Sequence, residues 1–166
     1  MAISDFDLML SLLNDDDFTN LTSFKWQAID DLRSYRQVKK KESVIADKKG
    51  IYVISSEQGE ILYIGKAKCL HSRICSHSKA MIGADEERAP AWDQFFRYYE
   101  NSKLKVQYAF INGFSDEKSE HVRQALERAL QVKHRPYFDT IYSKNKKLVH
   151  NIEKEVFKCR ALSEDL

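Results

Sequence analysis

The chain has 166 residues, 43% hydrophobic and 31% charged, a balance typical of one globular domain with at most a terminal extension. Its three cysteines, Cys69, Cys75 and Cys159, lack C-x-x-C spacing, which argues against a disulfide framework or a cysteine zinc site and favours a reducing compartment. No apolar run approaches the ~20 residues of a membrane span and the start lacks a basic signal region, so we expect a cytoplasmic protein without membrane contact.

The net charge of +2 conceals an asymmetry along the chain. Residues 1–31 hold seven acidic residues and one lysine, a net charge of −6, whereas residues 32–166 hold 26 basic and 18 acidic residues, a net charge of +8. This split predicts that the larger part meets an anionic partner. Two ordinary solvated surfaces explain the charges equally well at this point.

Two helices are expected before residue 48. Apolar residues recur every three or four positions from Ser4 to Leu13, which predicts an amphipathic helix. A second helix is expected to begin near Thr22 or Ser23 and to trail into Lys39–Lys41; its apolar side would comprise Phe24, Ala28, Leu32 and Tyr35. Neither segment carries recognisable chemistry, so residues 1–47 are interpreted as an N-terminal helical extension whose role is packing.

From residue 51 onwards, the spacing of the apolar residues no longer fits a helix. The stretches IYVIS and EILYIG are rich in β-branched and aromatic residues, and the turn-forming SEQGE lies between them, so a β-hairpin is predicted. Beyond Gly65, the spacing of Leu70, Ile74 and Met81 predicts a helix.

The remaining elements complete an α+β pattern. ADEERAP is expected to be a loop, WDQFFRYYEN a short aromatic helix, and LKVQYAFI a further strand. From Asp116 a longer helix is predicted, which ends before Pro136. The order predicts a small antiparallel sheet with helices packed on it. Four aromatic residues could stack on bases or belong to the core, and the core role is favoured. They are Trp92, Phe95, Phe96 and Tyr99.

Several functional side chains are expected to converge. Tyr52 and Tyr63 can share one face of the hairpin if its register allows, and Arg73 and His77 are neighbours four residues apart on a helix. With Lys66, they make a surface of donors and cations suited to a phosphate. Further along, Glu127 lies at the border of an apolar helix stripe. One such acid beside a basic cluster can hold Mg²⁺, which keeps several waters on few protein ligands.

These motifs resemble the GIY-YIG nuclease family, named for tripeptides that stand here as Gly50-Ile51-Tyr52 and Tyr63-Ile64-Gly65. The stretch YIGKAKCLHSRICSH is most similar to the nuclease domain of the bacterial excision-repair nuclease that makes the first incision. The family glutamate, followed by a KHRP segment, stands here as Glu127 followed by KHRPYFD. The resemblance covers residues 48–145, which we interpret as the nuclease domain, and leaves 146–166 as a C-terminal tail.

The resemblance implies a three-stranded antiparallel sheet flanked by helices, with glycines that permit close backbone approach. It also implies roles in hydrolysis. Tyr52 would be, or belong to, the general base; Tyr63 would position the water or the phosphate; and Lys66 would lower the pKa of the Tyr52 phenol, ordinarily near ~10. Arg73 would stabilise the charge of the pentacovalent phosphate, and His77 would be a hydrogen-bonding partner or alternate base.

A divalent cation is implied as well, Mg²⁺ or Mn²⁺, with Glu127 as its single protein ligand. Asp139 stands where the family often has Asn; since an ionised Asp only accepts hydrogen bonds, it would join the metal surroundings or be a neutral replacement. Beyond the catalytic groups, contacts with DNA phosphates are expected from exposed cations: Lys66, Lys68, Arg73, Lys144, Lys146 and Lys147.

Taken singly, each of these residues has an ordinary interpretation. A lone Tyr on a strand is usually only a good β former, and Glu127 alone would be a helix-surface acid paired with Lys133 or Arg123. In this order and spacing, the ordinary interpretations no longer suffice, and the resemblance implies a metal-dependent endonuclease that cuts DNA by one-metal hydrolysis. The alternative is a catalytically silent DNA-binding or adaptor module that works through its N-terminal helices and a partner protein. For either function, DNA is the expected partner, and the N-terminal helices would contact a further protein or form a homodimer.

Overall fold

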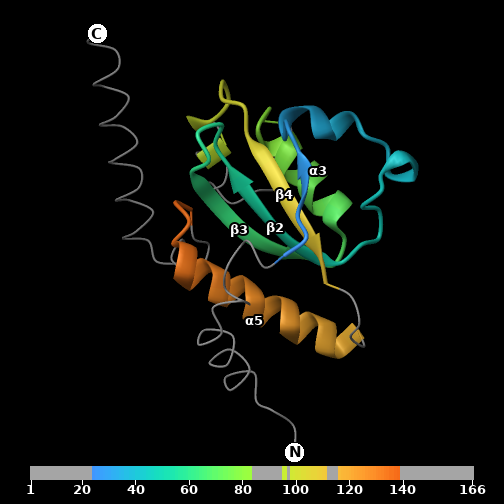
Figure 1. Ribbon diagram of the computed structural model, residues 1–166. Coiled ribbons are helices and arrows are strands. Elements are labelled where there is room, and N and C mark those ends of the chain that lie inside the picture. Colours follow the sequence, from blue (N-terminus) through green and yellow to red (C-terminus); the bar gives the residue numbers. More distant parts are fainter. Residues whose placement is uncertain (1–23, 84–94, 97, 112–115, 139–166) are drawn as a thin grey trace, which may run out of the picture.

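The computed structural model describes residues 24–83, 95–96, 98–111 and 116–138, in which one antiparallel sheet carries a helix on each face (Figure 1). Its strands are β1 (Gln27–Ile29), β2 (Gly50–Ser55), β3 (Ile61–Ala67) and β4 (Lys105–Phe110). They are ordered β1-β4-β2-β3. The α+β prediction is confirmed, but the described part of the chain has four strands, so the expectation of three was wrong.

The hairpin of β2 and β3 forms where the sequence predicted it. Every residue of β2 is buried, as expected of an apolar strand with neighbours on both sides and covered faces. Gly59, with φ +85°, makes the turn, and its N–H donates to the Ser56 carbonyl at 3.0 Å. A register shift between Ile54 and Ser55 places Ser55 opposite Ile61.

The two faces of the sheet are covered by different elements. Helix α3 (Leu70–Ala80), as predicted, lies on one face together with the 3-10 helix η2 (Arg33–Gln37). Helix α5 (Asp116–His134) covers the other face and ends before Pro136, also as predicted. Two apolar clusters separate the helices from the sheet. The α5 cluster contains Ile51, Val53, Ile64, Ala125, Leu126, Ala129 and Leu130.

The segment before β2 differs from the prediction. In place of a long helix from residue 22 or 23, it forms β1, η2 and the 3-10 helix η3 (Lys40–Glu42). Helical spacing of its apolar residues was misleading because β1 pairs antiparallel with β4, with Gln27 opposite Tyr108. Leu32 and Tyr35 are buried in the other apolar cluster, the α3 cluster, together with Leu70 and Ile74 of α3. The helix predicted over Ser4–Leu13 lies outside the described residues.

The aromatic segment before β4 contributes to the core, as favoured from the sequence. Phe95 and Phe96 are helical and buried, and Tyr99 packs against them from a turn. Trp92 and the ADEERAP loop lie outside the described residues. The Phe96 ring lies against His77 of α3, with ring centroids 5.5 Å apart.

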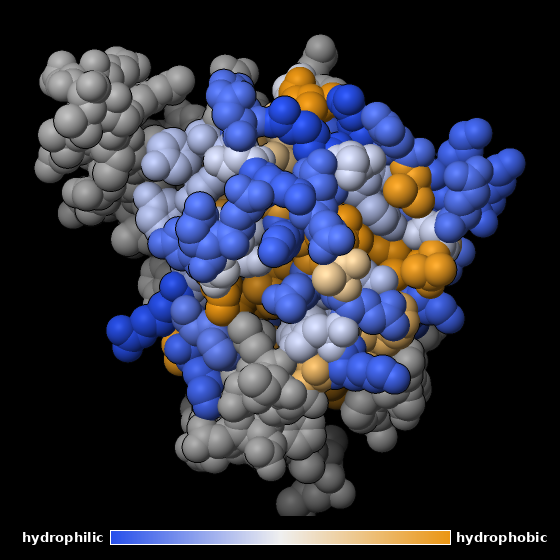
Figure 2. Space-filling model, turned by 45° about the horizontal axis from the view of Figure 1, so that its top comes forward, coloured by the Kyte–Doolittle hydropathy of each residue, from blue (hydrophilic) through white to orange (hydrophobic). Residues whose placement is uncertain are grey.

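Hydrophilic residues cover most of the face shown in Figure 2, and hydrophobic residues appear between them. Among the described residues, no helix has both the length and the apolar character that a membrane span requires.

Candidate active site

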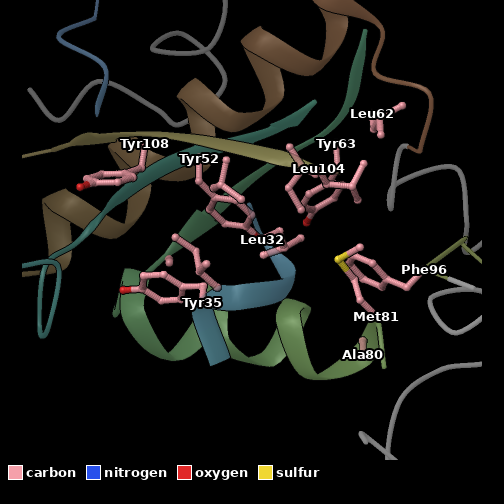
Figure 3. Packing of buried hydrophobic residues seen from close by; sticks show 14 of the residues in the cluster. Leu32, Tyr35, Tyr52, Leu62, Tyr63, Ala80, Met81, Phe96, Leu104 and Tyr108 are labelled. Atoms are coloured by element: carbon pink, nitrogen blue, oxygen red, sulfur yellow. The ribbon is translucent and has the colours of Figure 1, made fainter. Parts of the chain in front are cut away.

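Tyr52 and Tyr63 lie on the same face of the hairpin. Tyr52 is opposite Gly65 and Tyr63 is opposite Ile54, so the two tyrosines are diagonal neighbours on adjacent strands. Their ring centroids are 5.8 Å apart, and both side chains point from the sheet towards α3 (Figure 3). The register therefore brings these two side chains together, which the sequence left conditional.

Gly65 is the residue over which the tyrosines meet. A Cβ atom built there would lie 2.6 Å from the Tyr52 hydroxyl oxygen and 2.6 Å from Tyr63 Cε1, distances that real Cβ atoms essentially never show. At the start of β2, a Cβ on Gly50 would overlap the Ala109 carbonyl oxygen of β4. Gly65 thus permits the close approach of two aromatic side chains, and Gly50 permits the close approach of the β4 backbone.

His77 reaches the tyrosines from α3. Its side chain is only 2% exposed, and its Nε2 lies 2.7 Å from the Tyr52 hydroxyl. Its ring centroid is 5.4 Å from that of Tyr52 and 5.8 Å from that of Tyr63. A buried hydroxyl and an imidazole at this distance can exchange a proton.

Burial raises the pKa of the Tyr52 phenol well above its ordinary value, and the nearby Tyr63 raises it further. The positive charge of Arg73 opposes this shift, whereas the Glu127 carboxylate adds to it. The resemblance implied that Lys66 would lower this pKa, and that role stays a prediction. Arg73, which lies exposed on α3, acts in this direction in the structure.

Glu127 projects from α5 to the free edge of β3. Its Oε1 accepts a hydrogen bond from the Lys66 backbone N–H at 3.1 Å. One helical turn further, Gln131 Nε2 donates to the Ile64 carbonyl at 2.9 Å. Burial raises the pKa of the Glu127 carboxyl, and Lys66, Arg73 and Arg128 act against that shift. A partly buried carboxylate among cations is thereby held at the same end of the hairpin as Gly65.

A second carboxylate, not foreseen from the sequence, holds Lys66. Glu120 Oε1 lies 2.5 Å from Lys66 Nζ, and Glu120 Oε2 lies 2.6 Å from Nη2 of Arg123. Arg123 is 1% exposed and also donates to the Ser119 hydroxyl. These hydrogen bonds to Lys66 and Arg123 lower the pKa of Glu120 to about 2, against a smaller opposing effect of burial. Glu120 is therefore an ionised counter-charge between two cations.

The spacing of Glu120, Arg123 and Glu127 was a signal for this arrangement. Residues three and seven apart share one side of a helix, so an acid, a base and an acid face β3 together. From the sequence, Arg123 was a possible partner for Glu127; in the structure, Arg123 pairs with Glu120.

A cleft of about 470 Å³ opens between the end of β3, α3 and α5. Its lining includes four cations and one acid, with hydroxyl and thiol groups around them: Lys66, Lys68, Arg73, Arg123, Glu120, Ser72, Ser76 and Cys69. Such a lining suits an anionic ligand. Several predicted residues cannot be placed against this cleft because they lie outside the described residues: Asp139, Lys144, Lys146 and Lys147.

The donor set is compatible with a hard divalent cation. Within the described part of the chain, no group of three or more His, Cys, Asp or Glu side chains is close enough to enclose a metal. Glu127 would thus supply one carboxylate, and waters and a substrate phosphate would complete the coordination. Mg²⁺ commonly binds proteins in this way, through one or two carboxylates.

The comparisons with known proteins agree with this geometry. The family model of the GIY-YIG catalytic domain matches residues 48–144, which include the hairpin, α3, β4 and α5. No curated protein matches the chain. Because the match spans more than half of the sequence and includes both tripeptides and Glu127, the chain belongs to the GIY-YIG nuclease family.

Proposed function

We propose that this protein is a metal-dependent endonuclease that hydrolyses phosphodiester bonds in DNA by a one-metal mechanism. The observation that carries the proposal is the 2.7 Å contact between the buried Tyr52 hydroxyl and His77 Nε2, beside Arg73 and Glu127. It provides a route for a proton away from an attacking water. Arg73, whose charge acts on Tyr52, also lines the cleft of cations described above.

The raised pKa of Tyr52 decides how this residue would act. Because its pKa is raised, the Tyr52 phenol is protonated at neutral pH and does not act as a phenolate. Instead, Tyr52 passes its own proton to His77 Nε2 while its oxygen takes a proton from the water. The water oxygen then bonds to phosphorus, and the bond from phosphorus to the 3′-oxygen breaks.

The leaving 3′-oxygen keeps the electron pair of that bond and takes a proton from solvent, so the products carry 5′-phosphate and 3′-hydroxyl ends. Arg73 stabilises the extra negative charge on the phosphoryl oxygens. Tyr63 positions the water or the phosphate. A cation held by Glu127 would act as a Lewis acid on the departing oxygen.

The test is cleavage of supercoiled plasmid with Mg²⁺ or Mn²⁺ by the wild type and by the Glu127→Gln and Arg73→Ala variants, with EDTA as a further arm. Removal of one group that stabilises transition-state charge typically costs about 10²–10³-fold in rate, and we expect at least that for each variant. Glu57→Gln, an exposed change of the same chemistry in the hairpin turn, should cut like the wild type. DNA binding without cutting under any of these metals would instead support a silent binding or adaptor module.

A metal readout independent of activity accompanies this test. Ligands that bind only the folded state raise its stability, so Mg²⁺ should raise the Tm of the wild type but not that of Glu127→Gln. In the absence of metal, Glu127→Gln should be at least as stable as the wild type near neutral pH, because burial disfavours the charged carboxylate.

The biological setting is also part of the proposal. The run Gly65-Lys66-Ala67-Lys68 resembles the excision-repair nuclease, which supports a role in DNA repair. The free thiols Cys69 and Cys75 suit a reducing compartment such as the cytoplasm. A protein partner or homodimer contacting the N-terminal region remains a prediction, since residues 1–23 lie outside the described part.

A further inference from the structure

Among the described residues that line the active-site cleft, Glu120 is the only acid, and it lies with Lys66, Lys68, Arg73 and Arg123. Glu120 belongs to neither tripeptide, and the hydrolysis proposed above does not use it. A carboxylate in a cleft that receives a phosphate repels that ligand. A role for Glu120 must therefore come from the cations that it contacts.

The Glu120 carboxylate joins cations from two elements. Its Oε1 lies 2.5 Å from Nζ of Lys66 on β3, and its Oε2 lies 2.6 Å from Nη2 of Arg123 on α5. Lys68 Nζ lies further away, 4.0 Å from Oε2, on a largely exposed side chain. One oxygen thus accepts from a lysine of the cleft, and the other accepts from a buried guanidinium.

Arg123 anchors this carboxylate. Its side chain is buried, Nη1 donates to the Ser119 hydroxyl and Nη2 donates to Glu120, whereas Nε has no hydrogen-bond partner within the described part of the chain. A buried charge that loses its counter-charge strongly destabilises the fold. Glu120 is therefore held in the position that presents Oε1 to Lys66.

Lys66 is in turn held by α5 at both its backbone and its side chain. Its backbone N–H donates to Glu127 at 3.1 Å, and its Nζ donates to Glu120. Lysine carries its charge on a long, flexible stem, so an ammonium that is already held loses less freedom when substrate binds. We propose that Glu120 is a positioning residue: anchored by Arg123, it holds the Lys66 ammonium in place for the substrate phosphate, while its own charge lowers the affinity of the cleft for DNA.

This inference rests on the proposed nuclease function, and it separates binding from cutting. Glu120→Gln removes the acid and frees Lys66, so DNA should bind more tightly while cutting slows. A purely structural role would weaken both. Glu120→Asp keeps the charge beside Arg123 but withdraws the carboxylate by one methylene group, so it should slow cutting without changing affinity.

Binding is measured against salt concentration for a short DNA duplex, in EDTA so that no cutting occurs. A lysine that becomes free to neutralise one more phosphate increases the slope of log affinity against log salt by about 0.9 for B-DNA. We expect that increase for Glu120→Gln, and none when the same change is made in a Lys66→Met protein. Glu57→Gln, an equal change of charge in the exposed hairpin turn, should bind like the wild type. Weaker binding by Glu120→Gln, or the same increase without Lys66, would contradict the proposal.

Cutting is measured with Mg²⁺ at saturating protein, at a temperature where circular dichroism shows the variants to be folded. Glu120→Gln, Glu120→Asp and Lys66→Met should each cut at least tenfold more slowly than the wild type. The combined Glu120→Gln, Lys66→Met protein should cut no more slowly than Lys66→Met alone, because changes to residues that act through one another do not add. If Glu120→Gln does not fold, Glu120→Asp carries the same test.

A wild-type cutting rate in the Glu120 variants, or a combined loss equal to the product of the single losses, would overturn the positioning role. A wild-type protein that binds DNA but never cuts would contradict the nuclease function instead. In that case the salt slopes, which need no cutting, still decide whether Glu120 restrains Lys66, so the two failures are distinguishable.

Discussion

At the scale of single residues, the site depends on the missing side chain of Gly65 and on the burial of Tyr52 and His77. Gly65 leaves room for the Tyr52 hydroxyl, and that hydroxyl is then close to His77. The same burial raises the pKa of Tyr52. The tyrosine and the histidine are therefore best understood as one unit whose geometry Gly65 permits.

Gly65→Ala tests this dependence. The added methyl group must push both tyrosines away, so we expect a loss of about 1–3 kcal/mol in the free energy of unfolding, as for other overpacked sites. Plasmid cleavage should fall by at least tenfold at a temperature where the variant is still folded. Urea denaturation and a cleavage assay measure the two effects.

Gly59→Asn is the matched control for that change. Gly59 has a positive φ but open space around it, and Asn tolerates this backbone region better than most residues. The control should retain cleavage. A Gly65→Ala protein that is as stable and as active as the wild type would show that the close approach at Gly65 is not required.

At the scale of elements, α5 closes the exposed edge of β3 with its side chains. Glu127 accepts from the Lys66 N–H, Gln131 donates to the Ile64 carbonyl, and the chain after α5 continues the seal, since the Phe138 N–H donates to the Leu62 carbonyl at 2.7 Å. An unpaired strand edge is a site for unwanted pairing. The helix that supplies the candidate metal ligand thus also protects the strand that carries Tyr63.

Glu120→Gln tests the ion pairs between α5 and β3. The Glu120 carboxyl has a folded-state pKa of about 2, below its value of ~4.3 in an unfolded chain. The ionised carboxylate therefore stabilises the folded state at pH values above the unfolded-state pKa. This contribution is lost as the pH falls towards the folded-state pKa of about 2. We expect the variant to be about 1–3 kcal/mol less stable at pH 7, a range that allows for partial solvent screening.

The difference in free energy of unfolding between the wild type and Glu120→Gln should become smaller when urea denaturation is repeated from pH 7 down to pH 3. Glu57→Gln, which replaces an exposed residue of the turn, serves as the comparison at each pH. A gap that stays constant over this range would mean that the ion pairs with Lys66 and Arg123 are not its source.

At the scale of the whole molecule, residues 24–47, which precede the family match, pack against the described nuclease core. β1 extends the sheet beside β4. The Leu32 N–H donates to the Leu104 carbonyl at 2.8 Å, and Leu32 and Ile45 are almost fully buried in the α3 cluster. The boundary predicted at residue 47 stays a prediction, but these contacts give residues 24–47 a part in the core.

Leu32→Ala tests that shared core. Removal of a fully buried leucine side chain typically costs about 2–5 kcal/mol, and the loss should appear in one cooperative transition seen alike by circular dichroism and tryptophan fluorescence. Val44→Ala, at a position 75% exposed, should change stability by less than about 0.5 kcal/mol. Two separate transitions, or a loss near that of the control, would support an independent N-terminal unit.

The sequence by itself determined the elements whose patterns repeat over a few residues. The hairpin, α3, β4 and α5 all form where alternation or helical spacing placed them, because neighbouring residues suffice to set these periods. The motifs also predicted that Tyr52, Tyr63, His77 and Glu127 belong to one site. The structure brings the two tyrosines and His77 together, and Glu127 contacts Lys66 from α5.

Only the tertiary structure decided the partners that lie far apart in the chain. β1 has three residues and no alternating signature, so its strand character comes from pairing with β4. Lys66 and Glu120 are separated by 54 positions, and nothing local in either segment specifies their contact. The same holds for η2, where the Arg36 backbone N–H donates to Ser78 of α3. Long-range contacts of this kind depend on the packed fold, whereas local periodicity depends only on near neighbours.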